Sequence, residues 1–485
     1  MTLIFNNHNF KYELESVVKL FYPAQLFSIL YDERNADDDF CFTRLKKGKK
    51  FTRLFAVVKI GGLKKRLAGK LDNDSPDYFG KCELMLSRLL FVCLEKLTGI
   101  TPKWGLITGV RPVKRVNAML SEGNSKTDIF NTLEDDYLVK HEKCELAFKT
   151  AETQKRIIDS LDKKSFSLYV SIPFCPTRCT YCSFVSQSME KSTAEIPPYV
   201  DNLCKELEYT SDITKKLGLR LDTVYFGGGT PTSIDAFLLE KIMQKIEDSF
   251  DLSFLREYTV EAGRADTITE EKLTVIKNYG ATRISINPQT LDNNVLKAIG
   301  RRHTAEQFFE RFELARKMGF DNINTDLIAG LPADSVDGFK ATVDGIITLS
   351  PENITVHTLS IKRAAELNKG GCSFDNSVEE MVEYAADRLT KRSYLPYYLY
   401  RQKNTLGNLE NTGYSKPNME SLYNVYIMEE LQTIIAVGAG ASTKLVGDNE
   451  IKRIFNYKHP LEYNNHFELM LEKKKAITEF YEAKE

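Results

Sequence analysis

The sequence has no surplus of positive charge, and this absence excludes one class of partner. Its 485 residues hold 66 Lys and Arg against 67 Asp and Glu, a formal net charge of −1 at pH 7. A protein that binds duplex nucleic acid needs a large positive surplus to displace counterions. We therefore expect no nucleic-acid partner, and an anionic substrate must meet local clusters of Lys and Arg.

Long apolar runs are absent as well. No stretch approaches the roughly 20 apolar residues of a membrane span, and the opening "MTLIFNNHNF" has no basic start followed by an apolar segment. We expect a cytoplasmic chain without a membrane span. Its length exceeds one ordinary hydrophobic core, so two or three domains are expected.

Cysteines are few, and their odd number is unlike a disulfide framework. Three of the nine lie within eight positions, at Cys175, Cys179 and Cys182. The other six are scattered and are interpreted as small buried or incidental residues that no metal site needs. They are Cys41, Cys82, Cys93, Cys144, Cys204 and Cys372.

Three regions differ in pattern. Residues 1–164 mix alternating stretches with helical ones and predict an α+β domain of unknown role, with a hairpin around Gly61 and Gly62 and a basic loop at "WGLITGVRPVKRV". Residues 165–362 alternate short β-rich runs with amphipathic helices. Residues 363–485 open with a helix, "SVEEMVEYAADRLTKR", and then become tyrosine-rich and mixed, which we interpret as a substrate-covering domain.

The middle region predicts parallel strands joined by helices. Six strand candidates alternate with helical segments such as "DAFLLEKIMQKIEDSF" and "TAEQFFERFELARKM", which favours a (β/α) barrel or a doubly wound sheet. The strand candidates are "SLYVSI", "TVYFGG", "YTVEAG", "RISIN", "INTDLIAG" and "ITVHTLSI". Glu261, Gln289, Asp326 and Ser360 follow strand ends, where sites in such folds collect.

The three clustered cysteines indicate an iron-sulfur cluster. A structural zinc site wants four ligands, a disulfide would leave one thiol over, and a thioredoxin-type pair would ignore Cys175. Three thiolates in one loop suit a cubane cluster with one iron open to another ligand.

The spacing C-x3-C-x2-C after the first strand, with Tyr181 before the third cysteine, resembles the radical S-adenosylmethionine (SAM) superfamily. The resemblance implies a 4Fe-4S cluster on Cys175, Cys179 and Cys182, SAM on the open iron, and a partial (β/α)6 radical SAM barrel. The expected fold class is therefore α/β, with that barrel between an N-terminal α+β domain and a C-terminal mixed region.

Further stretches resemble the oxygen-independent coproporphyrinogen III oxidase branch, and the long N-terminal extension is most similar to its coproporphyrinogen dehydrogenase variant. They are "YVSIPFC", "FGGGTPT", "VEAGR", "RISINPQ", "IGRRHT", "NTDLIAGLP", "YRQKN" and "IIAVGAGAS". By resemblance, a first SAM contacts Tyr169, Gly228, Glu261, Ser360 and Ser442. A second contacts Tyr181, Gly229, Thr230, Gln289, Arg301 and Asp326.

The implied reaction is oxidative decarboxylation of coproporphyrinogen III to protoporphyrinogen IX in haem biosynthesis, with one or two SAM molecules and an electron donor such as flavodoxin or ferredoxin. No catalytic residue beyond the cluster and SAM is implied. The tetrapyrrole carries four carboxylates, so basic side chains must meet them. The candidates are Arg302, Lys362, Arg363, Arg401 and Lys403.

Two departures keep other functions open. Oxidases of this branch have a fourth cysteine two positions after the third, where this sequence has Phe184. Haem chaperones of the branch carry H-N-x-x-Y-W, where "YNVYIM" here places Tyr423 in the histidine position and Ile427 and Met428 in the aromatic ones. A haem chaperone, or a radical SAM enzyme that methylates or degrades another tetrapyrrole, therefore stays an alternative.

Overall fold

The chain forms two compact units in the computed structural model. One comprises Met1–Phe148 with Arg401–Leu409, and the other comprises Lys149–Tyr400 with Glu410–Glu485. The structure describes residues 1–23, 25–31, 39–182, 184, 186–360, 377–402, 405–448 and 450–483. The sequence-based division at residues 164 and 362 stays a prediction.

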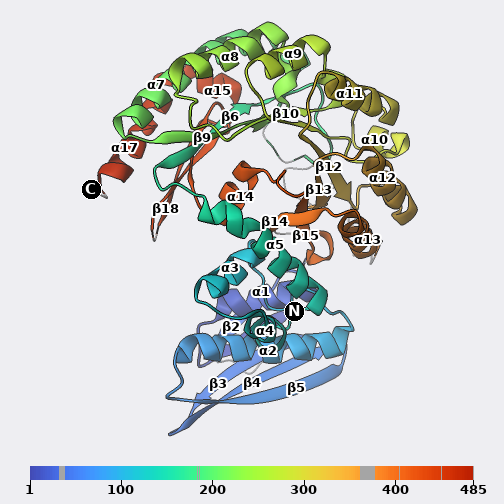
Figure 1. Cartoon of the computed structure of the whole chain (residues 1–485). Coiled ribbons are helices and arrows are strands. Elements are labelled where there is room, and N and C mark those ends of the chain that lie inside the picture. Colours follow the sequence, from blue (N-terminus) through green and yellow to red (C-terminus); the bar gives the residue numbers. More distant parts are fainter. Residues whose placement is uncertain are drawn as a thin grey trace. The chain divides into compact units, whose positions relative to one another are not determined.

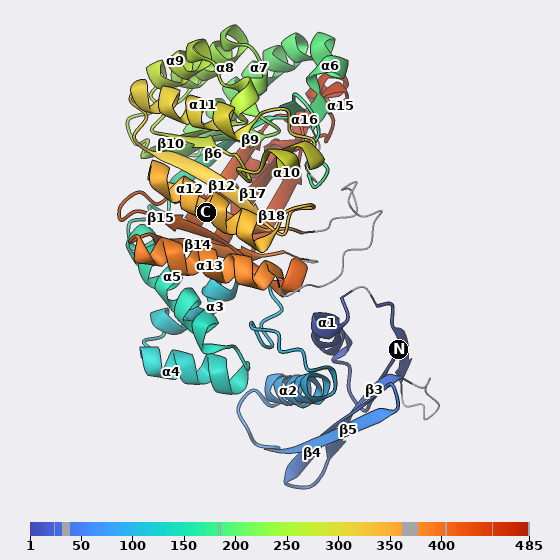
Figure 2. The same ribbon diagram turned by 90° about the vertical axis from the view of Figure 1, so that its right-hand side faces the viewer.

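The first unit is built on a five-stranded sheet in the order β2-β1-β3-β4-β5. β1 pairs in parallel with β2 and β3, whereas β3, β4 and β5 are antiparallel. The strands are β1 (Thr2–Asn6), β2 (Ser28–Tyr31), β3 (Phe40–Lys47), β4 (Phe51–Ile60) and β5 (Leu63–Asp72). Helices α1 (Lys11–Phe21) and α2 (Tyr78–Thr98) lie on one face of this sheet (Figure 2).

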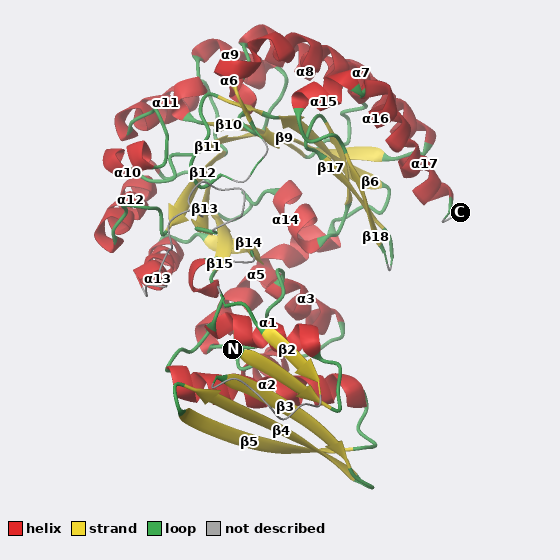
Figure 3. Ribbon diagram, turned by 180° about the vertical axis from the view of Figure 1, so that it is seen from behind, coloured by secondary structure: helices red, strands yellow, loops and turns green. Residues whose placement is uncertain are grey.

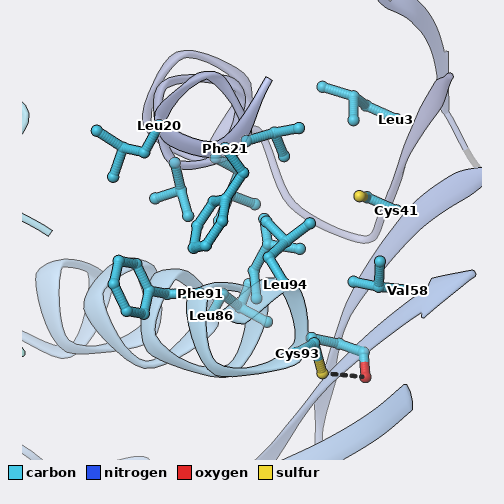
Figure 4. Packing of buried hydrophobic residues seen from close by; sticks show 14 of the residues in the cluster. Leu3, Leu20, Phe21, Cys41, Val58, Leu86, Phe91, Cys93 and Leu94 are labelled. Atoms are coloured by element: carbon cyan, nitrogen blue, oxygen red, sulfur yellow. Dashed lines mark hydrogen bonds between the residues drawn. The ribbon is translucent and has the colours of Figure 1, made fainter. Parts of the chain in front are cut away.

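The core of this unit lies between that face and the two helices (Figure 4). Alternate residues of β4, including Leu54 and Val58, are buried because successive side chains of a strand point to opposite faces. Helix α2 buries Leu86 and Cys93 from its apolar face and ends before Gly99. The predicted hairpin around Gly61 and Gly62 is confirmed by the pairing of β4 with β5.

The rest of the first unit is helical. It contains α3 (Pro112–Ser121), α4 (Lys126–Asn131), a π-helical turn (Thr132–Asp136) and the start of α5 (His141–Asp159). The predicted basic loop is wrong in part, because Lys114 and Arg115 lie on α3. Pro112 at its first position favours helix, since a proline lacks only an N–H that would be unpaired there.

The second unit contains an eleven-stranded sheet in the order β14-β15-β13-β12-β11-β10-β9-β6-β16-β17-β18. Strands β6, β9, β10, β11, β12 and β13 are parallel neighbours in chain order, which confirms the expected partial (β/α)6 barrel. Their bounds are β6 (Ser165–Ile172), β9 (Arg220–Gly228), β10 (Glu257–Gly263), β11 (Arg283–Ile286), β12 (Ile323–Ala329) and β13 (Asn353–Thr358).

Helices cover the convex side of the curved sheet (Figures 1 and 3). They connect successive strands, as right-handed crossovers require. They are α6 (Met189–Ser192), α7 (Ile196–Lys216), α8 (Ala236–Ser249), α9 (Glu270–Asn278), α10 (Asn293–Ala298), α11 (Ala305–Lys317) and α12 (Val336–Leu349). In the described part of the chain, no helix combines the length and apolarity of a membrane span.

The C-terminal region extends the same sheet at both edges. Strands β14 (Leu395–Arg401) and β15 (Glu410–Ser415) follow β13, and β16 (Thr433–Val437), β17 (Ser442–Val446) and β18 (Ile451–Phe455) follow β6. Helix α14 (Leu422–Glu429) lies on the concave side of the sheet (Figures 1 and 3). The remaining helices are α13 (Ser377–Lys391), α15 (Pro460–Asn465), α16 (Phe467–Lys473) and α17 (Lys475–Glu482).

Candidate functional site

The three clustered cysteines lie in one loop after the first parallel strand. Cys175 belongs to the short strand β7 (Phe174–Cys175), which pairs with β8 (Gln187–Ser188). The amide of Cys182 donates to the carbonyl oxygen of Cys179 over 3.1 Å, which turns the chain between them. One short folded segment at the carboxyl end of β6 therefore carries all three thiols.

Buried polar contacts hold this loop. The guanidinium of Arg264 donates to the carbonyl and hydroxyl oxygens of Thr177 over 3.1 and 2.8 Å and pairs with Asp266 through two further nitrogens. The Thr177 hydroxyl donates to the carbonyl of Gly300 over 2.9 Å. Sequence reasoning missed the role of Arg264, although a charged residue directly after a buried strand, in "VEAGR", was the available signal.

The surroundings of the three thiols disfavour free thiolates. Burial raises the pKa of the Cys175 and Cys182 thiols, and negative charge on Cys179 raises it further. Thiolates here would repel one another unless bound iron neutralised them. Within the described ranges no three His, Cys, Asp or Glu side chains form a group that could hold a metal ion. The thiolates of a cubane bind different irons and need not converge on one point.

The glycine run at the end of β9 packs against the strand that leads into the cysteine loop. Gly228 has φ +106°, and a Cβ there would lie 2.9 Å from the Ser171 hydroxyl. A Cβ on Gly229 would lie 2.5 Å from the carbonyl oxygen of Phe174. The side chain of the next residue, Thr230, places its Oγ1 3.5 Å from Sγ of Cys175. Only glycine permits this close approach, which fixes the β9 end beside the thiols.

A stack of tyrosines leads to Glu261 on the concave side of the sheet. The Tyr225 ring lies 4.3 Å from that of Tyr423 and 6.1 Å from that of Tyr169, between centroids. Its hydroxyl donates to Oε1 of Glu261 over 2.6 Å. Burial raises the pKa of Glu261 to about 7, although the Tyr225 hydrogen bond opposes the rise. This carboxyl group can therefore change its charge near neutral pH.

Asp326 has the partner that its buried position requires. Oδ1 accepts from Nδ2 of Asn324 over 2.8 Å, and Oδ2 lies 3.7 Å from Nε2 of His357. Burial raises the pKa of Asp326, but the contact with His357 outweighs it, so that the pKa is lowered overall. The backbone of Gln289 donates to the carbonyl of Asp326 over 3.1 Å with a left-handed φ of 71°, a conformation that is costly without glycine.

Arg301 connects the backbone of Asn287 with the cysteine loop. Its guanidinium donates to the carbonyl of Asn287 over 2.6 Å and to the hydroxyl of Tyr181, directly before Cys182, over 3.3 Å. Its Nε is buried and has no partner within the described part of the chain. An acceptor supplied by a bound ligand would satisfy this nitrogen.

Arg283 is a buried cation that sequence reasoning missed as a site residue. It opens β11 and is 1% exposed, and no described residue offers a partner to Nε or Nη2. Burial lowers its pKa, but the nearby Tyr397 and Glu257 outweigh this effect and raise it overall, so the guanidinium stays charged. The available signal was an arginine at the start of the otherwise apolar strand "RISI".

The remaining candidates are more dispersed. Ser360 is half-buried just beyond β13, and Ser442 opens β17 opposite Phe455. Exposed Arg302 pairs with Glu190 over 3.1 Å. In the first unit, buried Arg401 donates to the carbonyls of Ile107 and Asn408. Lys362, Arg363, Lys403 and Cys372 lie outside the described residues.

Comparison with known proteins identifies the family. Residues 169–346 match the model of the radical SAM superfamily. The oxygen-independent coproporphyrinogen-III oxidase-like protein HemZ of Bacillus subtilis is 38% identical over 97% of this chain and 96% of its own length. The chain belongs to the radical SAM superfamily, in the branch of the oxygen-independent coproporphyrinogen III oxidases.

Two further similar proteins match part of the chain. The haem chaperone HemW of Lactococcus lactis is 31% identical over 59% of this chain and 71% of its own length. The solved structure of coproporphyrinogen III oxidase HemN from Escherichia coli superposes with a TM-score of 0.50 and 20% identity, over 66% of this chain and 73% of that chain. The HemN likeness shows the shared barrel fold.

Membership of the radical SAM superfamily implies a 4Fe-4S cluster and SAM. The described residues fit both groups. Three thiols lie in one loop, glycines bring a backbone edge close to it, and Arg301 contacts Tyr181 of the loop. Arg301 and Arg283 also have buried nitrogens without acceptors among the described residues. Unpaired buried donors are rare in folded proteins, and a bound anion would supply acceptors to these nitrogens.

Proposed function

We propose that this chain catalyses the oxygen-independent oxidative decarboxylation of coproporphyrinogen III to protoporphyrinogen IX in haem biosynthesis. The observation that carries the proposal is Arg283, a buried guanidinium of the radical SAM barrel with two nitrogens that have no partner among the described residues. A propionate carboxylate is an acceptor of matching charge and planar geometry. The full-length similarity to an oxidase-like protein supports the same substrate class.

The cluster and SAM would supply, when bound, a 5′-deoxyadenosyl radical that takes a hydrogen atom from a propionate β-carbon. The resulting substrate radical would lose carbon dioxide and pass one electron to an external one-electron acceptor, which would leave a vinyl group, with 5′-deoxyadenosine as the other product. Cys175, Cys179 and Cys182 would hold the cluster. Arg283 would hold the propionate carboxylate in place, so that the β-carbon is presented in one orientation.

The other side chains of the site divide into two proposed groups. Those proposed to hold the SAM bound to the cluster are Tyr169, Gly228, Glu261, Ser360 and Ser442. Those proposed to hold a second SAM are Tyr181, Gly229, Thr230, Gln289, Arg301 and Asp326. Burial of Glu261 and the Tyr225 hydrogen bond set a pKa near 7, which allows this carboxyl group to adjust its charge to the ligand beside it.

The experiment is an anaerobic assay of the reconstituted protein with a reductant, SAM and coproporphyrinogen III, followed by mass spectrometry. Stepwise loss of two carboxyl groups, absent in Cys179→Ala, would establish the oxidase. Arg283→Lys should raise the KM for the porphyrinogen, whereas Arg220→Lys, at an exposed arginine of the same unit that pairs with Asp162, serves as the matched control. 5′-Deoxyadenosine formation without decarboxylation would contradict the substrate and favour another tetrapyrrole, methylated or ring-opened.

A haem chaperone is the second candidate, favoured by the similarity to HemW. Tyr423, at the position of the chaperone histidine, is buried at 4% exposure and stacks on Tyr225, which disfavours that position as a haem ligand. Stable stoichiometric haem binding without SAM cleavage would support the chaperone and oppose the oxidase.

A further inference from the structure

The antiparallel half of the first unit carries an unusual concentration of positive charge. From Arg44 to Leu71 the sequence has eleven Lys and Arg and no Asp or Glu, although the whole chain has a net charge of −1. These residues are Arg44, Lys46, Lys47, Lys49, Lys50, Arg53, Lys59, Lys64, Lys65, Arg66 and Lys70. The balance of charges over the whole chain, on which the expectation of no nucleic-acid partner rested, conceals this local excess.

Strand register gathers much of this charge on one face of the sheet. Lys46, Arg53 and Lys70 form one row across β3, β4 and β5, and Lys59 pairs with Lys64 in another. The alternate residues of these strands face α1 and α2 on the other side (Figure 2). Since side chains alternate between faces, one face is the apolar core and the other is basic.

Aromatic rings are interleaved with these charges on the basic face. Across β3 and β4, Arg44 lies opposite Phe55 and Phe42 lies opposite Val57. Val57 in turn lies opposite Arg66 on β5. Further along β4, Phe51 lies on the same face. Phe40, Phe42, Phe51 and Phe55 are all half-buried, whereas the cations around them are mostly exposed.

Charges and rings also contact one another directly. The ammonium of Lys70 lies 3.5 Å from the centroid of the Phe51 ring, and the guanidinium of Arg66 lies 5.4 Å from that of Phe55. A charged edge strand alone can serve to prevent sheet-to-sheet aggregation. Here the charge spreads over three strands and includes ring platforms, which that role does not require.

We propose that this face of the sheet binds a single-stranded nucleic acid. We call it the basic sheet face. Its residues are Arg44, Lys46, Arg53, Lys59, Lys64, Arg66, Lys70, Phe40, Phe42, Phe51 and Phe55. Cations along the strands neutralise phosphates, and half-exposed rings offer surfaces on which unpaired bases stack. Charge alone would serve any polyanion. The rings favour a single strand over a duplex, whose base faces are already stacked.

The test uses the full chain and fluorescence anisotropy with a labelled twelve-nucleotide oligouridylate, at several salt concentrations. The variant K64E/R66E/K70E changes three exposed residues of the basic sheet face. Its control, K11E/K81E/K140E, makes the same change of net charge at exposed residues of the same unit outside this sheet. Circular dichroism checks that both variants fold.

We expect the first variant to lose at least tenfold in affinity at 0.1 M salt, and the control to stay within twofold. For K64E/R66E/K70E, the slope of log K against log salt should become shallower by about 2, since three contacts are lost and each single-strand phosphate contact contributes about 0.7. Phe55→Leu should weaken binding about tenfold with the salt slope unchanged, because it removes stacking and not charge.

Three parallel arms complete the test. Oligothymidylate compares DNA with RNA. Binding of either oligonucleotide that is tighter than binding of the duplex supports a single-strand site. A twelve-base-pair duplex that binds as tightly as the single strand would overturn the proposal. So would equal losses in both triple variants, no binding of the oligonucleotide at 50 mM salt, or binding only to phosphatidylglycerol vesicles.

Discussion

Removing the charge of Lys474 should destabilise the second unit, because this residue neutralises a fully buried carboxylate. Nζ of Lys474 lies 3.0 Å from Oε1 of Glu206, and the two side chains are 1% and 0% exposed. The carboxylate also accepts from the amide of Gly438, Nδ2 of Asn456 and the hydroxyl of Tyr463. The pair thereby joins α7 and the C-terminal helices to the glycine-rich turn after β16.

Lys474→Met keeps the apolar length of the side chain and leaves Glu206 buried without a counter-charge. Breaking one side of such a pair costs about 3–5 kcal/mol. We expect about 3 kcal/mol here, because three hydrogen bonds to the carboxylate remain. Glu206→Gln removes the counter-charge of the ammonium, which also donates to the carbonyl of Ala436 over 2.9 Å, so a similar cost is expected.

The assay is urea unfolding of both single variants and of the double variant, followed by circular dichroism. The double variant removes both charges, so its cost should fall short of the sum of the single costs by at least about 2 kcal/mol. Lys475→Met, at the neighbouring exposed lysine, should change the free energy of unfolding by less than about 0.5 kcal/mol. Additive single costs, or a Lys474→Met protein as stable as its control, would refute the reasoning.

Three further predictions concern the site. Replacing Cys175, Cys179 or Cys182 by Ala should abolish iron incorporation, whereas Cys41→Ala and Cys204→Ala should leave it unchanged; four irons in all these variants would contradict the cluster assignment. Because the folded pKa of Glu261 is about 7, above the ordinary 4.5, the wild-type free energy of unfolding should fall as pH rises from about 4.5 to 7 and then level off. Glu261→Gln should remove up to about 3 kcal/mol of this decline, and superimposable pH profiles would disprove the burial effect. Gly228→Ala, at φ +106°, should cost about 1–3 kcal/mol in the free energy of unfolding and reduce cluster content, whereas Gly123→Ala, with nothing within 4 Å of its Cβ, should retain the cluster.

Local patterns predicted the strands and helices well, because their causes are local. The hairpin of β4 and β5, the parallel strands and α13 all appear where alternation or helical spacing placed them. The basic segment after "WGLITGV" was misread as a loop because Pro112 was not recognised as the first residue of a helix. Propensity and periodicity act over a few residues, so they are readable from the sequence.

Partners of buried polar groups could not be predicted in this way. Asp326 was expected to have one, but its identification as His357 needed the register of β12 and β13. The contact of Tyr225 with Glu261 and the pairing of Glu206 with Lys474 join positions 36 and 268 residues apart. No local pattern carries such information.

The sequence alone determined the superfamily, the cysteine loop and the alternation of strands and helices, since spacing and periodicity are properties of neighbouring residues. Only the tertiary structure showed that Arg283 is buried with unpaired nitrogens, that the tyrosines stack beside Glu261, and that cations and rings share one face of the N-terminal sheet. Burial, charge interaction and face sharing depend on which distant strands become neighbours, and folding decides this.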